Sequence, residues 1–230
     1  MRAYVINLKS REDRWDSVTI QADKLGVPIV RVDAIELGSL SEQNLFVASG
    51  VAATWKSHQL AMSIFLDSGE KYGIILEDDF LLTESWNTSA IEKALKVNPD
   101  FFQLGYLVTS SLDRLELIFN NLFDRCLKLL SNLCSFSIFL NRRFGGRLLI
   151  REQESLPWDV IPNEIRAGGQ AYLVSRKFAL ASKFMNTPPF TSADGMFISL
   201  GDVRTFRMFR FRKSLINQTD SMTSVHQRYL

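Results

Sequence analysis

Three consecutive carboxylates, Glu77, Asp78 and Asp79, directly follow a continuous apolar run at residues 72–76. Such a run, bounded by Gly69 and by acids, is typical of a buried central strand. Ligands of open α/β sheets bind at the C-terminal ends of the strands. Carboxylates this close repel one another unless a cation neutralises them, and an oxygen-rich site favours Mg²⁺ or Mn²⁺ over zinc. The sequence therefore predicts a divalent-metal site at this strand end.

The side chains of an extended chain alternate in direction, and this alternation divides the three acids. Glu77 and Asp79 are expected to point the same way and share the metal, whereas Asp78 faces elsewhere. A solvated turn that caps a helix is the competing interpretation of the same residues.

The segments around these acids alternate between strand and helix patterns. Strand-like runs occupy residues 2–8, 29–32, 72–76, 101–108, 169–174 and 205–211, and helical spacing occupies residues 10–26, 49–66, 86–97 and 175–185. Strands that alternate with helices imply βαβ units. Ser10, three residues before Asp13, has the spacing of a helix cap. We therefore expect one α/β domain over residues 1–230, built on a mixed, mostly parallel sheet, with an irregular tail from residue 217.

Residues 112–147 interrupt this alternation with an amphipathic helical insertion. Its apolar stripe ends in aromatic residues, and a basic run follows: Phe136, Phe139, Arg142, Arg143 and Arg147. An apolar stripe beside basic residues can bind an anionic membrane surface. The competing interpretation is that the stripe packs on the sheet or on a second copy of the chain in a homodimer.

Composition narrows the class of protein. Apolar residues make up 46% and charged residues 23%, which excludes a disordered chain. The net charge of +2 conceals an acidic first part, with 10 basic and 15 acidic residues up to position 100, and a basic remainder with 17 and 10. No apolar stretch is long enough to cross a bilayer, and the N-terminus lacks the zones of a signal peptide. We therefore expect a cytoplasmic protein.

Six segments, in order along the chain, resemble glycosyltransferase family 25, the lipooligosaccharide biosynthesis family. Residues 75–79 (ILEDD) resemble the LEDD form of its DxD motif. The other five matches are residues 5–14 with its INL opening, 50–58 with GEIGCxxSH, 169–175 with GTxAYLIS, 192–197 with PVDxxL, and 218–224 with its Q…S tail. Ala53-Thr54 stands where the family has Gly-Cys, and Ser224-Val225-His226 replaces SDI. The matches cover most of the chain outside residues 110–165.

The resemblance implies a nucleotide-sugar transferase with a GT-A-like fold. The donor would be a UDP-sugar, with galactose as the first choice, and the acceptor a lipooligosaccharide core glycan or glycolipid. Transfer would invert the anomeric centre. A Mn²⁺ or Mg²⁺ ion would stabilise the diphosphate leaving group. Work on a lipid-linked acceptor would place the enzyme at the inner face of the membrane.

The resemblance also assigns roles to individual residues. Asp79 and Glu77 would hold the metal, with His226 as a third ligand. Asp194 would be the base that deprotonates the acceptor. The donor would be bound by His58 and Asp78 and by Asn7, whose side chain can read a base or ribose edge. Arg11 and Arg14 lie three apart, so we expect them on one face of the first helix, where they could reach the nucleotide. More ordinary roles compete with these: a turn former for Asp194, a core residue for His58, solvated side chains for Arg11 and Arg14, and an exposed tail residue for His226.

Two other classes of function remain open on the sequence. Glu77, Asp79 and Asp194 could serve a metal-dependent phosphohydrolase or nuclease. Alternatively, a non-enzymatic module could dock on membranes or nucleic acid through the basic residues Arg204, Arg207, Arg210, Arg212 and Lys213. Apolar residues interleave with these arginines as on a half-buried strand, and no aromatic stacking motif accompanies them. We therefore do not expect nucleic acid as a partner.

Overall fold

The computed structural model describes residues 1–36, 47–107, 156–157 and 159–219. Residues 1–107 form one compact unit together with the part of the chain that begins at Asp159. The predicted insertion over residues 112–147 and the candidate ligand His226 lie outside the described residues, so both stay predictions. None of the helices in the described ranges is long and apolar enough to cross a membrane.

The fold is α/β, as predicted, with one mixed sheet. Its strands are β1 (Ala3–Asn7), β2 (Ile29–Asp33), β3 (Tyr72–Glu77), β4 (Phe80–Leu82), β5 (Phe101–Gly105), β6 (Val160–Pro162), β7 (Ala171–Ser175), β8 (Met208–Phe211) and β9 (Ile216–Gln218). The main order is β2-β1-β3-β7-β5-β8-β6, and β9 joins β4 to β5. β1 pairs in parallel with β2 and β3, whereas β7 runs antiparallel between β3 and β5. The beginning of β7 therefore lies at the edge where β1 and β3 end.

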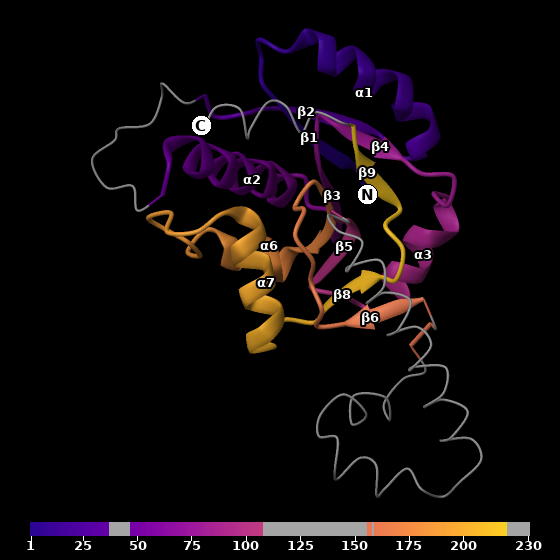
Figure 1. The fold of residues 1–230 in the computed structure, drawn as a ribbon. Helices are drawn as coiled ribbons and strands as arrows, with labels where there is room; N and C mark the ends of the chain where they lie inside the picture. Colours follow the sequence, from indigo (N-terminus) through magenta and orange to yellow (C-terminus); the bar gives the residue numbers. More distant parts are fainter. Residues whose placement is uncertain (37–46, 108–155, 158, 220–230) are drawn as a thin grey trace, which may run out of the picture. The chain divides into compact units, whose positions relative to one another are not determined.

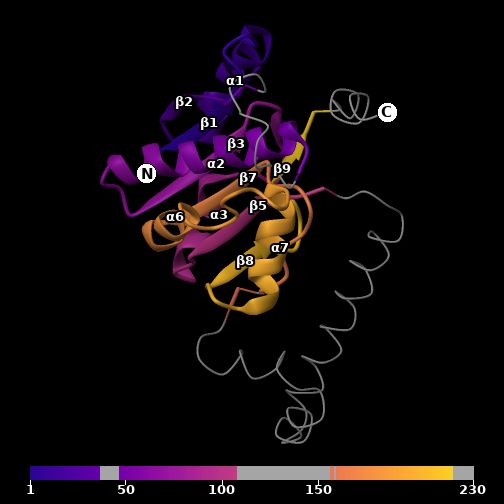
Figure 2. The same ribbon diagram turned by 90° about the vertical axis from the view of Figure 1, so that its left-hand side faces the viewer.

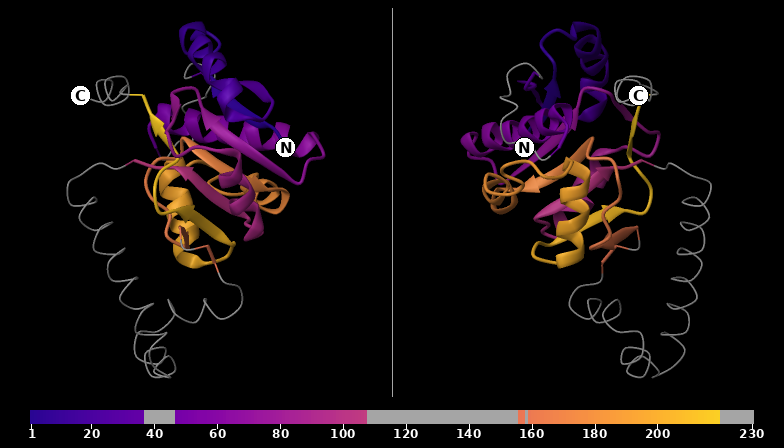
Figure 3. Two further views of the ribbon diagram at one scale, coloured as in Figure 1. Left: turned by 90° about the vertical axis from the view of Figure 1, so that its right-hand side faces the viewer. Right: turned by 60° about the vertical axis from the view of Figure 1, so that its left-hand side comes forward.

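The described helices are α1 (Glu12–Leu25), α2 (Ser49–Asp67), α3 (Thr88–Lys96), α6 (Arg176–Ser182) and α7 (Ala193–Val203). Helices α2, α6 and α7 cover one face of the sheet, and α1 and α3 cover the other (Figures 1 and 2). Further views in Figure 3 show α7 beside the strands at the β8 side of the sheet. The core between the sheet and α2, α6 and α7 is aromatic, and Phe197 of α7 contacts five rings in it: Trp55, His58, Phe101, Tyr172 and Phe178.

A close crossing of α2 over β3 depends on Gly73. A Cβ atom there would lie 2.7 Å from Cδ2 of Phe65, so the ring occupies the space of the missing side chain. His58 lies two turns before Phe65 on the same helix face, about 10 Å along the axis, and Glu77 lies four residues beyond Gly73, about 13 Å along the strand. Because α2 and β3 run in opposite directions, this crossing brings His58 next to Glu77.

The structure differs from the predictions at the start of α1, at α7 and at β9. The predicted Ser10 cap is wrong: the Arg11 N–H closes a turn onto the Leu8 carbonyl, so α1 begins only at Glu12 and has no side-chain cap. Helix α7 was expected to be a turn, because two glycines obscure its helical pattern. Ser192 caps it by accepting a hydrogen bond from the Gly195 N–H. Of the tail expected to be irregular from residue 217, residues 217 and 218 form the end of β9, and residues 220–230 lie outside the described residues.

Two of the basic residues near β8, Arg207 and Arg210, bind other parts of the fold. The Arg210 side chain is only 1% exposed; it pairs with Glu164 at 2.5 Å, and its guanidinium lies over the Tyr106 ring. Arg207 donates a hydrogen bond to the Val97 carbonyl at the end of α3. Arg210, proposed as a phosphate contact in the docking alternative, is therefore part of the folded interior.

Glu164→Ala should lower the free energy of unfolding by about 3 kcal/mol, because it leaves the Arg210 charge buried without its carboxylate. Urea denaturation of the purified protein measures the change. Glu12→Ala is the matched control: it also removes a carboxylate paired with an arginine, Arg31, but the Glu12 side chain is 65% exposed, so stability should change little. Equal effects of the two substitutions would show that the Glu164–Arg210 pair does not stabilise the fold.

Candidate functional site

The three carboxylates at the end of β3 occupy three different environments. Glu77 is the last residue of the strand, and Asp78 and Asp79 form the turn that leads into β4. Glu77 lies on the face covered by α2, and Asp78 on the face covered by α1, as alternation along the strand requires. The parallel neighbour β1 ends at the same edge and contributes Asn7.

Side chains on the α1 side of the sheet compensate the negative charge of Asp78. Arg14 Nη1 and Asn7 Nδ2 each donate to its carboxylate at 2.7 Å. The Asn7 Nδ2 also donates to the Arg11 carbonyl, while the buried Asn7 Oδ1 has no hydrogen-bond partner. Three predicted donor-binding residues, Asn7, Arg14 and Asp78, are thus brought together in one polar cluster.

Arg11 does not join Arg14 in this cluster. It precedes the first helical residue, and its guanidinium makes two hydrogen bonds to the exposed Asp13 carboxylate, at 2.8 and 2.7 Å. The Arg11 hydrogen bond lowers the pKa of Asp13 to about 2. The expectation that Arg11 and Arg14 share one helix face is therefore wrong, because α1 begins after Arg11.

His58 is fully buried under the pocket. Its Nδ1 lies 2.8 Å from the Tyr172 hydroxyl, and its Nε2 lies 3.3 Å from Glu77 Oε1. Burial raises the pKa of Tyr172 well above its usual range, so that hydroxyl stays protonated. The pocket-lining residues include Glu77 but not His58. His58 contacts a residue of the pocket wall, Glu77, but does not line the pocket itself. The predicted donor contact of His58 stays a prediction.

Asp194 lies in the first turn of α7, and its carboxylate accepts hydrogen bonds from the backbone amides of Gly168 and Gly169. A Cβ on Gly169 would lie 2.8 Å from Asp194 Oδ1, so only glycine allows this close approach. Burial raises the pKa of Asp194, and the negative charge of Glu77 raises it further. A carboxylate with a raised pKa is better suited to accept a proton near neutral pH.

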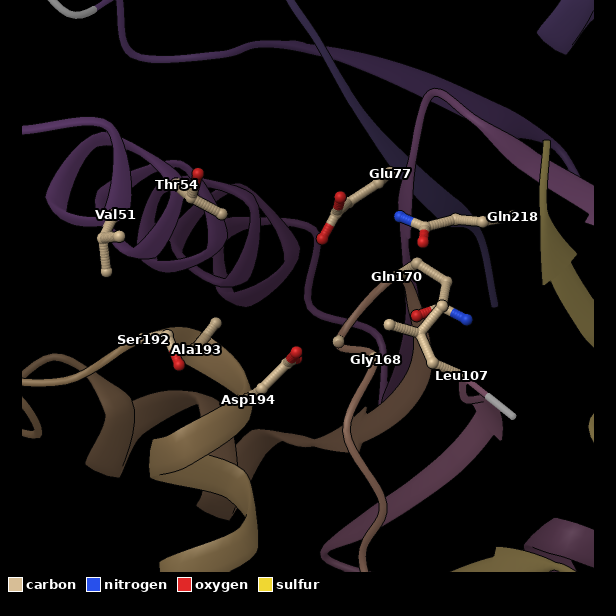
Figure 4. Close-up of a pocket in the computed structure, with 11 residues that line it drawn as sticks. Val51, Thr54, Glu77, Leu107, Gly168, Gln170, Ser192, Ala193, Asp194 and Gln218 are labelled. Carbon is tan, nitrogen blue, oxygen red and sulfur yellow. The ribbon is translucent and has the colours of Figure 1, made fainter. Parts of the chain in front are cut away.

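Glu77 and Asp194 face each other across one pocket. Figure 4 shows both carboxylates directed into the space between α2, α7 and the loop before β7. The cavity measures about 170 Å³, and its walls also include Thr54, Gln170, Ser192 and Gln218. Two acids from β3 and α7 can therefore act on one ligand.

Asp79 is a buried carboxylate close to two other negative charges. Burial raises its pKa to about 7, and the nearby charges of Glu77 and Asp78 contribute. Its Oδ2 accepts a hydrogen bond from Gln218 Nε2 at 3.2 Å, and Gln218 extends into the pocket beside Glu77. This excess of negative charge on oxygen ligands suits a hard divalent cation.

The described residues provide only part of a metal shell. No group of three or more histidine, cysteine, aspartate or glutamate side chains within the described ranges could hold a metal ion. Glu77 and Asp79 are the two predicted ligands that the structure describes, and both are carboxylates. Mg²⁺ commonly binds through one or two carboxylates plus substrate phosphates and water, so the donor set fits such an ion.

Sequence reasoning missed Gln218 and the pairing of Tyr172 with His58. Gln218 opens the tail that resembles the family's Q…S tail, but it received no role, because the three-residue strand that positions it is too short a pattern to recognise. Tyr172 had a usable signal, because alternation along β7 places its side chain on the same face of the sheet as Val174, towards α2. Its partner could be named only once the strand order was known.

Asp79→Asn should stabilise the protein above pH 7 and leave it nearly unchanged at pH 4, with EDTA present to remove metal. Folding raises the pKa of the Asp79 carboxyl from 3.8 to about 7. The protonated carboxyl therefore contributes its full stability to the fold below pH 3.8, and this contribution is lost as the pH rises through about 7. Thermal melting at pH 4 and pH 8 measures the difference. Asp23→Asn, at an exposed position of α1, is the control; a wild-type-like melting profile for Asp79→Asn would contradict the raised pKa.

Comparisons with known proteins identify no family for this chain. No protein-family model matches it, and no curated protein does. Among solved structures 13 chains match. One is described as the crystal structure of A197 from STIV, with 12% sequence identity and a TM-score of 0.43, over 94% of this chain and 82% of that chain. This distant likeness assigns neither a family nor an activity.

Proposed function

We propose that this protein is a metal-dependent glycosyltransferase, similar to family 25 and GT-A-like in fold. It would transfer a sugar, galactose as the first choice, from a UDP-sugar to a glycan such as a lipooligosaccharide core, with inversion. The observation that supports this most is the shared pocket: Glu77, from the DxD-like segment, faces Asp194, from the segment that resembles the acceptor-side turn. Two segments far apart in sequence thus supply the two acids that the activity needs.

Asp194 is proposed as the general base. Inverting transfer requires a group that removes the proton of the acceptor hydroxyl as that oxygen attacks the anomeric carbon. The Gly168 and Gly169 amides hold the Asp194 carboxylate in place, and its raised pKa favours proton capture. The proton then resides on Asp194 and passes to solvent after the product leaves.

Glu77 and Asp79 are proposed as the ligands of Mn²⁺ or Mg²⁺. When bound, the ion would offset the charge that develops on the diphosphate leaving group. Gln218 orients the Asp79 carboxylate through its hydrogen bond. On the other face of the strand end, Asn7, Arg14 and Asp78 form the polar cluster proposed for the nucleoside, and the buried Asn7 Oδ1 is its available acceptor.

Peripheral binding to an anionic membrane at the cytoplasmic face is part of the same proposal, because a lipid-linked acceptor would be presented there. It depends on residues 112–147, which lie outside the described residues, as does a homodimer formed through them.

Asp194→Asn should reduce kcat by roughly 10² or more, because the amide keeps the shape of the side chain but cannot accept the proton. UDP binding, measured by calorimetry, should barely change. Asp202→Asn, at an exposed position near the other end of α7, should leave kcat near the wild-type value. A nearly normal kcat for Asp194→Asn would place the base elsewhere.

Asp79→Ala should abolish transfer, because a metal ligand is lost. EDTA should abolish transfer by the wild type, and added Mn²⁺ should restore it in the wild type but not in the variant. Transfer of labelled sugar to an acceptor measures the activity of the variant and of the EDTA-treated wild type. Full turnover in EDTA would overturn the metal-dependent mechanism.

A further inference from the structure

His58 and Tyr172 form a buried pair directly beneath a pocket carboxylate. Neither side chain is exposed, and the His58 ring also packs edge-on against Phe197. A polar pair in this position must satisfy its hydrogen-bonding atoms within the fold, because a buried polar atom without a partner is costly. One end of the pair, His58 Nε2, lies 3.3 Å from Glu77 Oε1 and makes no hydrogen bond to any residue that the structure describes.

The two contacts determine which ring nitrogen carries a hydrogen. If Nδ1 accepts from the Tyr172 hydroxyl, the neutral ring carries its hydrogen on Nε2, and a charged ring carries hydrogens on both nitrogens. The remaining form would turn a bare Nε2 lone pair towards a carboxylate oxygen, which is repulsive. In both favourable forms, an N–H therefore faces Glu77.

We propose that Tyr172 and His58 are positioning residues that hold the Glu77 carboxylate over the pocket. Tyr172 orients the imidazole, and the Nε2–H fixes Oε1, which leaves the second carboxylate oxygen to take a ligand. This inference rests on the proposed function in taking that ligand to be a divalent ion. Hydrogen bonds of this kind behind a ligating carboxylate commonly change metal affinity 10–100-fold.

The first test uses ¹⁵N NMR to determine which ring nitrogen of His58 carries a hydrogen, and it does not depend on enzymatic activity. The chain has only two histidines, so His58→Gln assigns the signals. In the metal-free wild type at pH 8, Nε2 of His58 should carry a hydrogen and Nδ1 should not, and in Tyr172→Phe the Nδ1 signal should shift because its hydrogen-bond donor is lost. A bare Nε2 in the wild type, or an unchanged spectrum in Tyr172→Phe, would overturn the inference.

The second test measures Mn²⁺ affinity in the presence of UDP, from the paramagnetic resonance of the free ion. Tyr172→Phe should weaken binding 10–100-fold. Tyr72→Phe is the matched control, because it removes another buried tyrosine hydroxyl, bonded to Asn98 on the far side of β3; affinity should not change.

His58→Gln, which can still offer an N–H, should bind Mn²⁺ better than His58→Leu, which cannot. Wild-type affinity in Tyr172→Phe, or equal losses in the two His58 variants, would contradict the positioning role. If the wild type itself binds no Mn²⁺, the proposed metal site fails, and the NMR result alone decides the inference.

Discussion

Mutual repulsion among three carboxylates at one strand end is the constraint around which this structure is organised. Glu77, Asp78 and Asp79 follow a buried strand, and the surrounding elements treat each charge differently. Arg14 and Asn7 compensate Asp78, and His58 lies beside Glu77. Asp79 is left with a pKa raised to about 7. A fold that gathers three carboxylates at one strand end gives up stability that a cation could restore.

Strand direction decides which groups gather around that charge. The parallel pairing of β1 and β3 ends both strands at one edge and brings Asn7 to Asp78. The antiparallel β7 begins at the same edge, so the loop before it supplies backbone amides rather than side chains to Asp194. Phe197, packed among aromatic rings of the core, anchors α7 and so keeps Asp194 in register with that loop. Backbone amides and the packing of α7 together therefore hold the Asp194 carboxylate in place.

Patterns within short segments of the sequence predicted individual helices and strands and the faces on which their side chains lie. Helical spacing identified α2, a continuous apolar run identified β3, and alternation separated Asp78 from Glu77. Helix α7 was missed because glycines at positions 195 and 201 weaken its pattern, although the Ser192 cap was visible. The insertion of β7 between β3 and β5, and hence the contact of Tyr172 with His58, depends on topology that no short segment encodes.

The position of Arg210 illustrates the same limit. A basic residue between phenylalanines on a strand predicts a half-buried arginine, yet its partner, Glu164, lies on the loop after β6. The docking alternative counted Arg210 among the basic residues that would contact membranes or nucleic acid. The fold instead uses this cation to hold the loop that leads to Gly168 and the pocket.

The central claim is that the pocket between Glu77 and Asp194 binds and cleaves a UDP-sugar. The most direct measurement is UDP release from a panel of UDP-sugars with Mn²⁺, alongside a simple phosphodiester as a competing substrate. The account predicts UDP release from one or a few sugars, UDP-galactose first, and no cleavage of the phosphodiester. Phosphodiester hydrolysis without UDP release from any sugar would contradict it and assign the same acids to a phosphohydrolase.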